Sequence, residues 1–435
     1  MDYLNKVMEM LKSTHSQFHA VEIAAKELSE SGFAELMEGK TFPKLEPGKK
    51  YYVKRNQSSI IAFKVPLSKP RAIRVAAAHS DSPTFKIKPN PILASKNLAK
   101  VNVEPYGGAL YSPWLDRALS FAGRIMVKTS KGIKSRLIDL DEDLMVIPSV
   151  CIHMKRDANE SSSFNAAIDM VPIIGEHVEG LGIPSLLQDR NILKEDEELV
   201  SFDLSLYVRD EPKLLGLSKE LLLAPRLDDL SSAYSGLLGF IEGEDKGDVD
   251  AFCIFDNEEV GSLTRQGANS TFLKDTLRRL CLAMGLTEDE MLSCIANGFL
   301  LSEDNAHANH PNHPELSDPT TDVRLNRGIV IKHNANQKYT TDAYSAALVK
   351  AISEKEGLPY QEYTNRSDLR GGSTLGNISN SEVSFRSADI GLAQLAMHSC
   401  NETMGAKDIE CNVRFNKAYF SLPLNLEGES IEIGE

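Results

Sequence analysis

Residues 71–85, RAIRVAAAHSDSPTF, decide the fold because they join an apolar run to a polar turn. The run RAIRVAAA is short and is stopped by His79 and Pro83, which predicts a buried β-strand. Asp81 follows His79 by two residues, so strand periodicity returns its side chain to the same face. The pair is either a metal-binding imidazole with a carboxylate that orients it, or a turn with a satisfied histidine.

Strand-like and helix-like segments alternate along much of the chain. DAFCIF (250–255) and GFLLSE (298–303) have the apolar character of buried strands. Helical periodicity runs through residues 15–37, 229–243 and 270–284. This alternation is typical of an α/β sheet, and polar residues follow its strands at their carboxyl ends.

Residues 93–224 have a different character. They contain β-rich pieces among Gly, Pro and charged turns, with little helical periodicity. We interpret them as an inserted β-rich domain, so that residues 1–92 and 225–435 form one discontinuous domain. We expect the acidic end EGESIEIGE (427–435) to be a frayed tail.

Composition excludes several classes of function. The 435 residues carry a net charge of -14, which would repel nucleic acid and anionic lipid. No apolar run approaches the roughly 20 residues that span a bilayer. The six cysteines are scattered, as in reduced cytosolic proteins, and the amphipathic start MDYLNKVMEMLKSTHSQ is unlike a signal peptide. We therefore expect a cytoplasmic protein that binds neither nucleic acid nor membranes.

Acidic residues mark further candidate sites. Asp228 stands where a helix begins, so it is either an N-cap or a carboxylate that bridges metal ions. Glu258 and Glu259 directly follow a predicted strand, and adjacent acids repel each other unless a cation lies near. One of them can bind metal while the other takes a proton from water, or both belong to a solvated turn.

An aspartate and three histidines follow the predicted strand GFLLSE. Asp304 follows GFLLSE, and His307, His310 and His313 come soon after it. Pro311 and Pro314 prevent these histidines from lining one helix face, so we expect a loop that lines a pocket rather than one three-histidine metal site.

His398 precedes Ser399–Glu402, which has the form of a capping box, so it is either a ligand at the sheet edge or a structural residue. The glycine-rich segment GGSTLG (371–376) is most simply a tight turn near a pocket. Because open α/β sheets collect ligands at the carboxyl ends of their strands, one shared metal site explains the separate candidates better than unrelated coincidences do.

Several segments in one order resemble the aspartyl-aminopeptidase family of zinc metallopeptidases. The resemblance runs from about residue 17 to residue 420 and is carried by SQFHAVEIAAKELSESGF, AAHSDSPTFKIKPNP, YGGALYSPWLDRALSFAGR, LAPRLDDL, DNEEVGS, DNAHANHPN and AMHSCNETMG. It implies an α/β/α sandwich peptidase domain interrupted by a β-rich dimerisation domain. It also implies a homo-oligomer, a tetrahedral dodecamer built from dimers.

The resemblance also implies roles for individual residues. It implies two divalent metal ions, with zinc first and manganese or cobalt as alternatives, and peptide substrates cleaved at their first residue. Glu258 would be the general base and Asp81 would orient a ligand. The implied metal ligands are His79, Asp228, Glu259, Asp304 and His398.

The resemblance also implies residues that act in substrate specificity and in assembly. His153 matches a histidine that the family lends to a neighbouring subunit's active site, and Lys332 matches a lysine near a pocket for acidic side chains. We expect His307 and His310 to contribute to substrate binding. Acidic amino-terminal residues rank first and neutral ones second. The alternatives are a related carboxypeptidase or deacylase, or an inactive shell-forming scaffold.

Overall fold

The computed structural model describes residues 2–160, 163–369, 371–372, 374–426 and 428–434, and the chain divides into two compact units. The first unit comprises Met1–Asp81, Pro212–Met397 and Glu402–Glu435. The second comprises Ser82–Glu211 and His398–Asn401. No helix in the described part of the chain has the length and apolar character needed to cross a membrane.

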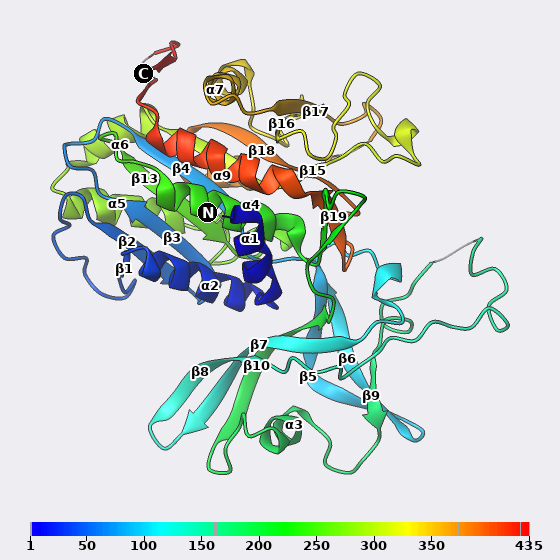
Figure 1. Ribbon diagram of the computed structural model, residues 1–435. Helices are drawn as coiled ribbons and strands as arrows, with labels where there is room; N and C mark the ends of the chain where they lie inside the picture. Colours follow the sequence, from blue (N-terminus) through cyan, green and yellow to red (C-terminus); the bar gives the residue numbers. More distant parts are fainter. Residues whose placement is uncertain (1, 161–162, 370, 373, 427, 435) are drawn as a thin grey trace. The chain divides into compact units, whose positions relative to one another are not determined.

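The first unit is built on one large mixed sheet (Figure 1). Its strands lie in the order β1 (Ala34–Glu35), β2 (Lys50–Arg55), β3 (Ser59–Lys64), β13 (Val249–Phe255), β4 (Ile73–His79), β14 (Phe299–Glu303), β18 (Arg386–Leu395), β19 (Glu402–Gly405), β12 (Leu221–Ala224) and β11 (Lys213–Leu215). Off this path lie β15 (Ala306–His307), β16 (Ile329–His333) and β17 (Tyr360–Thr364).

The central strands β13, β4, β14 and β18 run parallel to one another. β13, β4 and β14 are buried along their whole length, as expected for parallel strands that are covered on both faces. Their carboxyl ends therefore meet at one edge of the sheet. This arrangement confirms the predicted α/β fold.

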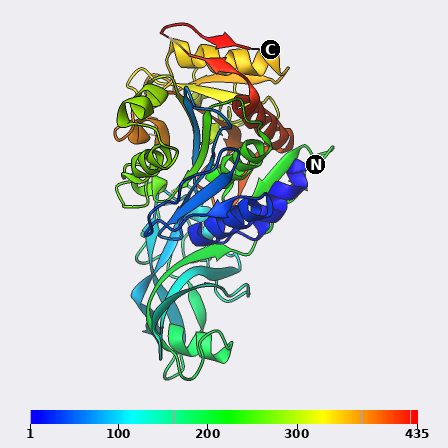
Figure 2. The same ribbon diagram turned by 90° about the vertical axis from the view of Figure 1, so that its left-hand side faces the viewer.

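Helices cover both faces of this sheet (Figure 2). One face packs against α1 (Tyr3–Lys12), α2 (Gln17–Glu30), α4 (Leu227–Glu242), α7 (Ala343–Lys355) and α9 (Ala406–Ser421). The other packs against α5 (Phe272–Ala283), α6 (Glu288–Ala296) and α8 (Leu375–Ser379). Alternation within β3 serves both layers, since Ile60 belongs to one apolar cluster and Ile61 to the other.

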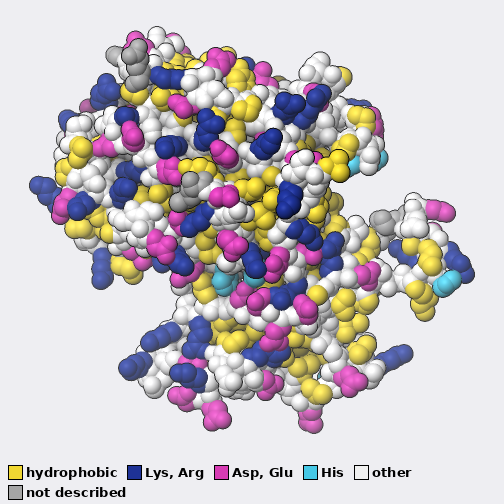
Figure 3. All heavy atoms as spheres, in the orientation of Figure 1, with side chains coloured by type: hydrophobic (Ala, Val, Ile, Leu, Met, Phe, Trp, Pro, Cys, Tyr) yellow, Lys and Arg dark blue, Asp and Glu magenta, His cyan; other side chains and the backbone are white. Residues whose placement is uncertain are grey.

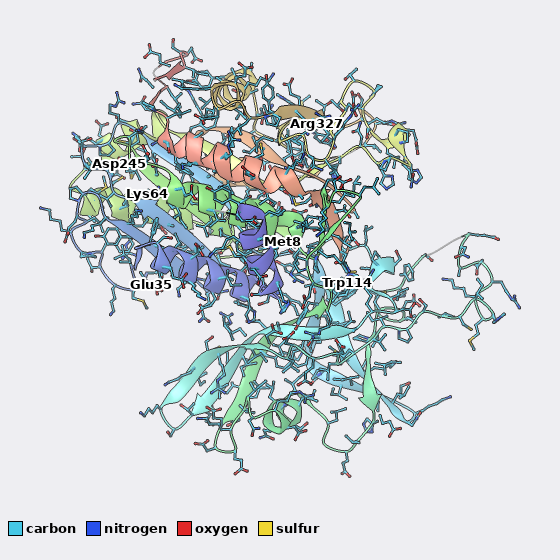
Figure 4. The ribbon with its side chains drawn as sticks, in the orientation of Figure 1. Met8, Glu35, Lys64, Trp114, Asp245 and Arg327 are labelled. Carbon is cyan, nitrogen blue, oxygen red and sulfur yellow. The ribbon has the colours of Figure 1, made fainter. Side chains whose placement is uncertain are left out.

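Buried cations fix the carboxyl-terminal ends of the two long helices against the sheet. Lys64, labelled in Figure 4, donates to the carbonyl oxygens of Phe240 and Gly243 at the end of α4. Arg74 donates to the carbonyl oxygen of Leu422 beyond α9, at 2.9 Å. A cation favours the carbonyl-rich end of a helix, so these contacts hold α4 and α9 in place.

The second unit is an antiparallel sheet with its own core. Its order is β8 (Gly132–Asp139), β7 (Leu119–Thr129), β10 (Glu198–Val208), β5 (Thr84–Ser95), β6 (Leu98–Tyr106) and β9 (Ile173–Glu176), and α3 (Ile183–Asp189) contributes to the same core. Trp114, labelled in Figure 4, packs edge-on against Phe85 with ring centroids 5.2 Å apart.

A long segment of the second unit, residues 147–172, forms neither helix nor strand where the structure describes it. Apolar, basic and histidine side chains are visible on it in Figure 3. Val150 and Met154 are 55% and 83% exposed. Exposed apolar side chains grouped on one segment are typical of a surface that contacts another protein.

The unit boundaries differ in position from those placed by sequence, at 81/82 and 211/212 rather than near 93 and 224. β5 pairs with β6 from Thr84 onward, so the second sheet begins before residue 93. The hairpin of β11 and β12 joins β19 in the first sheet, so the first unit resumes before residue 224.

Three local predictions were wrong. The helix predicted at 15–37 ends at Glu30, where a turn and the short strand β1 follow. Ser399–Glu402 is not a capping box, because Glu402 begins strand β19 and α9 starts only at Ala406. The acidic end is not a frayed tail throughout, since β21 (Glu432–Ile433) pairs with β20 (Leu424–Asn425).

Candidate metal centre

The carboxyl edge of the parallel strands gathers the predicted site residues of the first unit. His79 is the last residue of β4. Glu258 and Glu259 begin a 3-10 turn shortly after β13, and Asp304 directly follows β14. β13, β4 and β14 are neighbours, so their ends deliver one imidazole and three carboxylates to the same crevice.

Asp228 enters the same crevice from the start of α4. Its backbone is not helical (φ -82°, ψ 111°), the peptide bond to Asp229 is cis, and the helix has no side-chain cap. The N-cap interpretation of Asp228 was therefore wrong. Its carboxylate instead lies at the imidazole of His79, with Oδ1 3.7 Å from Nε2.

Two groups of side chains in the first unit have the geometry of metal-binding sets. His79, Asp228 and Asp304 form one, and His79, Glu258 and Glu259 form the other. Within each group the ligand atoms all lie within 4.8 Å of one another. Imidazole nitrogen with carboxylate oxygen is the donor chemistry of zinc, so these residues fit that ion.

The hydrogen bonds of His79 select its tautomer. Its Nδ1 lies 3.0 Å from the backbone carbonyl oxygen of Asp81, which can only accept a hydrogen bond. When the ring is neutral its proton therefore sits on Nδ1, and the lone pair of Nε2, on the side of Asp228, can bind a metal. A histidine that donates from one nitrogen and offers the other is prepared to bind metal.

Burial and mutual repulsion raise the pKa values of the carboxyl groups. Burial is the main cause for Glu258, whose pKa rises to about 8; the charge of His79 opposes this rise, and those of Asp304, Asp81 and Asp228 add to it. Burial also raises the pKa of Asp304 and of Asp229. A divalent cation would favour the ionised form of all these groups.

The charged form of His79 is favoured by the same acids. Burial alone would lower its pKa, but hydrogen bonds to Asp228 and Asp81 and the charge of Asp229 raise it well above the ordinary value. The buried acids around this ring therefore favour a positive charge at its position.

Asp81 holds the loop that carries the two glutamates. Its Oδ1 accepts the backbone N–H of Glu258 at 3.1 Å, and its Oδ2 accepts that of Glu259 at 3.2 Å. Its Oδ1 also lies 3.4 Å from Nδ1 of His79. One carboxylate thus connects the end of β4 with the turn after β13.

Lys332 places a buried ammonium group beside Asp304. The side chain comes from β16 and is 2% exposed. Its Nζ donates to the carbonyl oxygens of Asp304 at 2.7 Å and Asn305 at 3.3 Å, and lies 3.7 Å from Oδ2 of Asp304. It also lies 5.1 Å from the ring centroid of Tyr339.

The remaining predicted residues lie apart from these groups or in the second unit. His307 is in β15, with its ring 6.1 Å from that of Tyr363, while His310 is an exposed loop residue. His153 is exposed in the second unit. His398 also belongs to that unit, where its Nδ1 lies 3.1 Å from the carbonyl oxygen of Gly108. Its metal binding stays a prediction.

Sequence reasoning missed several buried polar residues around the centre. Asp229 accepts the backbone N–H of His79 at 3.2 Å. Asn305 donates to the carbonyl oxygen of Leu227 at 2.8 Å, so it connects the start of α4 with the end of β14. The doubled acid in LDDL was the available signal for Asp229. Nothing in the local sequence marks Asn305.

The glycine-rich segment 371–376 leads into α8, and Ser373 lies outside the described residues. Asp389 of β18 accepts hydrogen bonds from Thr374 at the end of this segment and from the backbone and hydroxyl of Thr340. The buried carboxylate of Asp389 therefore connects the loops that contain Thr340 and Thr374 to the central sheet.

A family model described as Aminopeptidase I zinc metalloprotease (M18) matches residues 10–420. The Probable M18 family aminopeptidase 2 of Clostridium acetobutylicum is 39% identical over 416 residues, covering 94% of this chain and 96% of the relative. The protein of the same description from Pseudomonas aeruginosa is 36% identical over 423 residues, covering 95% and 97%.

Solved structures of similar proteins share the fold. A chain in the cryo-EM structure of the Ape4 and Nbr1 complex superposes with a TM-score of 0.92 at 32% identity, covering 96% of this chain and 85% of that one. The structure of the S. cerevisiae mApe1 dodecamer gives a TM-score of 0.84 at 27% identity, with 96% of each chain covered.

We predict that Asp81→Asn weakens divalent metal binding by about 10-fold to 100-fold, because an amide nitrogen would face an N–H donor of the glutamate turn. Zinc affinity is measured by competition with a chromogenic chelator. Asp245→Asn is the matched control, since Asp245 (Figure 4) also accepts two backbone N–H groups, from Leu67 and Gly247. Equal zinc affinity in both variants would contradict the role of Asp81.

Proposed function

We propose, for a chain that belongs to the M18 family of zinc metallo-aminopeptidases, that the cluster around His79 is the catalytic centre and holds two divalent ions. The chain is a zinc-dependent aminopeptidase. The observation that carries the proposal is the pair of donor groups that share His79, each compact enough to surround one ion. Peptides with a free amino terminus are the proposed substrates.

The proposed ligand set combines these two groups with the sequence resemblance, which takes Glu258 as the base and not as a ligand. Asp228 would bridge the ions, with His79 and Asp304 on one side and Glu259 on the other. We assign His398 to complete the second set, on the sequence resemblance alone. Bound zinc ions would polarise the scissile carbonyl, lower the pKa of an attacking water and hold the substrate's free amino group.

Glu258 is the proposed general base. It stands beside Glu259, the resemblance does not assign it as a metal ligand, and its side chain is half-buried. Its carboxylate would take the proton of the attacking water and then deliver that proton to the leaving amine.

We predict that Glu258→Gln lowers kcat by roughly 10²-fold or more, because glutamine cannot accept the proton, while zinc content stays that of the wild type. The measurement combines steady-state cleavage of amino-acyl chromogenic substrates with metal analysis of the purified enzyme. Glu244→Gln, an exposed glutamate in the loop after α4, is the control. Retention of full kcat by Glu258→Gln would remove Glu258 from the mechanism.

We also propose that the enzyme prefers acidic amino-terminal residues. Lys332 supports this proposal because its ammonium group is buried beside Asp304, so a substrate carboxylate that approached it would gain a charge-assisted hydrogen bond in a protected environment. His307 and His310 are proposed to line the same approach from the loop after β14.

We predict that Lys332→Met lowers kcat/KM for substrates with amino-terminal Asp or Glu by about 10-fold to 100-fold more than for neutral substrates, because only acidic side chains lose a charged partner. Lys338→Met, at an exposed lysine of the next loop, is the control. An equal loss for acidic and neutral substrates would contradict the proposed pocket for acidic side chains. The role of Lys332 would then be limited to holding Asp304 in place.

Assembly is the last part of the proposed function. We propose a homo-oligomer, a tetrahedral dodecamer built through the second unit, in which His153 reaches the active site of a neighbouring subunit. Support comes from the exposed apolar side chains of the segment that carries His153. The six cysteines are scattered along the sequence, which suits the reducing cytoplasm in which we place the protein.

We predict that His153→Ala lowers kcat by about 100-fold, as for loss of one hydrogen-bond donor to the transition state. Co-assembly of His153→Ala with Glu258→Gln subunits restores part of the activity, because some sites then combine an intact Glu258 with an intact His153 from a neighbour. His177→Ala, at an exposed histidine of the same unit, is the control. Absence of any recovery in verified mixed assemblies would contradict a shared site.

A further inference from the structure

Glu402 is a buried carboxylate that the proposed mechanism does not use. It is the first residue of β19 and is 2% exposed. It is paired with Ala224 at the end of β12, four residues before Asp228. Among the described residues, Glu402 does not join either donor group around His79.

The side chain of Glu402 is directed at the backbone of the bridging aspartate. Its Oε2 accepts the N–H of Asp228 at 2.9 Å within a buried environment. This N–H needs a partner outside the helix, because Asp228 has non-helical backbone angles and stands before the first regular turn of α4. A carboxylate acceptor makes the bond charge-assisted and therefore stronger than one between neutral groups.

The same arrangement occurs at two other segments that carry proposed ligands. Asp229 accepts the N–H of His79, and Asp81 accepts those of Glu258 and Glu259. Both of these backbone segments are thus held by a carboxylate from a different segment, whereas the N–H of Asp304 donates to the carbonyl oxygen of Ile390. Glu402 supplies this contact for Asp228, which belongs to the donor group with His79 and Asp304.

We propose that Glu402 is a positioning residue of the metal centre, which fixes the backbone of Asp228 and thereby holds its carboxylate beside His79 for metal binding. The inference rests on the proposed function, because it takes Asp228 as the bridging ligand. The hydrogen bond restrains the Cα of Asp228, so the carboxylate is aimed before metal arrives. Loss of the acceptor would free the turn 225–228 to carry that carboxylate away from His79.

The test uses two substitutions with opposite expectations. Glu402→Met keeps the length of the side chain but removes the acceptor, and we expect zinc affinity to fall by about 10-fold to 100-fold. Glu402→Gln keeps an acceptor oxygen, and we expect less than about a threefold loss. Hydrogen exchange of the peptide that contains Asp228 should be faster in Glu402→Met alone.

Asp408 provides a matched control for a structural role. It is a buried carboxylate in α9 that accepts the backbone N–H groups of Asn326 at 2.7 Å and Gly328 at 2.8 Å. Asp408→Leu should lower the thermal stability of the full-length enzyme yet leave zinc affinity unchanged. A loss of stability without loss of zinc affinity in Glu402→Met would place Glu402 in the same structural class and overturn the proposal.

The result for Asp228→Asn separates the two levels of inference. If Asp228→Asn binds zinc as the wild type does, the ligand assignment in the proposed function fails. If Asp228→Asn loses zinc while Glu402→Met retains it, the ligand assignment stands and the role of Glu402 is refuted. An equal loss in Glu402→Gln and Glu402→Met would also refute it, because the acceptor oxygen would then be irrelevant.

Discussion

Repulsion between buried carboxylates is the constraint on which this structure depends. The parallel strands β13, β4 and β14 end at one edge and bring Glu258, Asp304 and their neighbours around a single imidazole. Like charges that are removed from water raise one another's pKa values, as the carboxyl group of Glu258 shows. Placing several buried carboxylates together destabilises the folded protein unless a positive charge lies among them. The stability of this site and its chemistry are therefore both linked to a bound cation.

Placement of the ligands is achieved through the backbone as much as through side-chain rotamers. Strand ends and a helix start leave N–H groups without partners in the regular structure, and carboxylates of neighbouring segments accept them. Acids that do not bind metal therefore hold the backbone of those that do. Lys64 and Arg74 extend the same principle to the opposite ends of α4 and α9, where cations meet carbonyl groups.

The sequence was sufficient for the parts that local patterns control. Apolar runs predicted β13 and β14, and a polar residue directly after a strand predicted the location of His79 and Asp304. Patterns failed where distant segments decide the outcome. Asp228 has the local signature of an N-cap, and Glu402 that of a capping box, yet the structure gives them a hydrogen bond to each other across 174 positions of sequence. No periodicity within a short window contains that pairing.

Charge balance bears on how many ions the centre holds. Lys332 contributes one buried positive charge beside Asp304. His79 in its neutral form contributes no charge. Together with Lys332, one divalent ion would offset three of the six carboxylate charges of the cluster, whereas two would offset five of them. The carboxylates concerned are Asp81, Asp228, Asp229, Glu258, Glu259 and Asp304. Asp81 and Asp229 would then bear the residual negative charge. They can do so because each already accepts a hydrogen bond from a backbone amide.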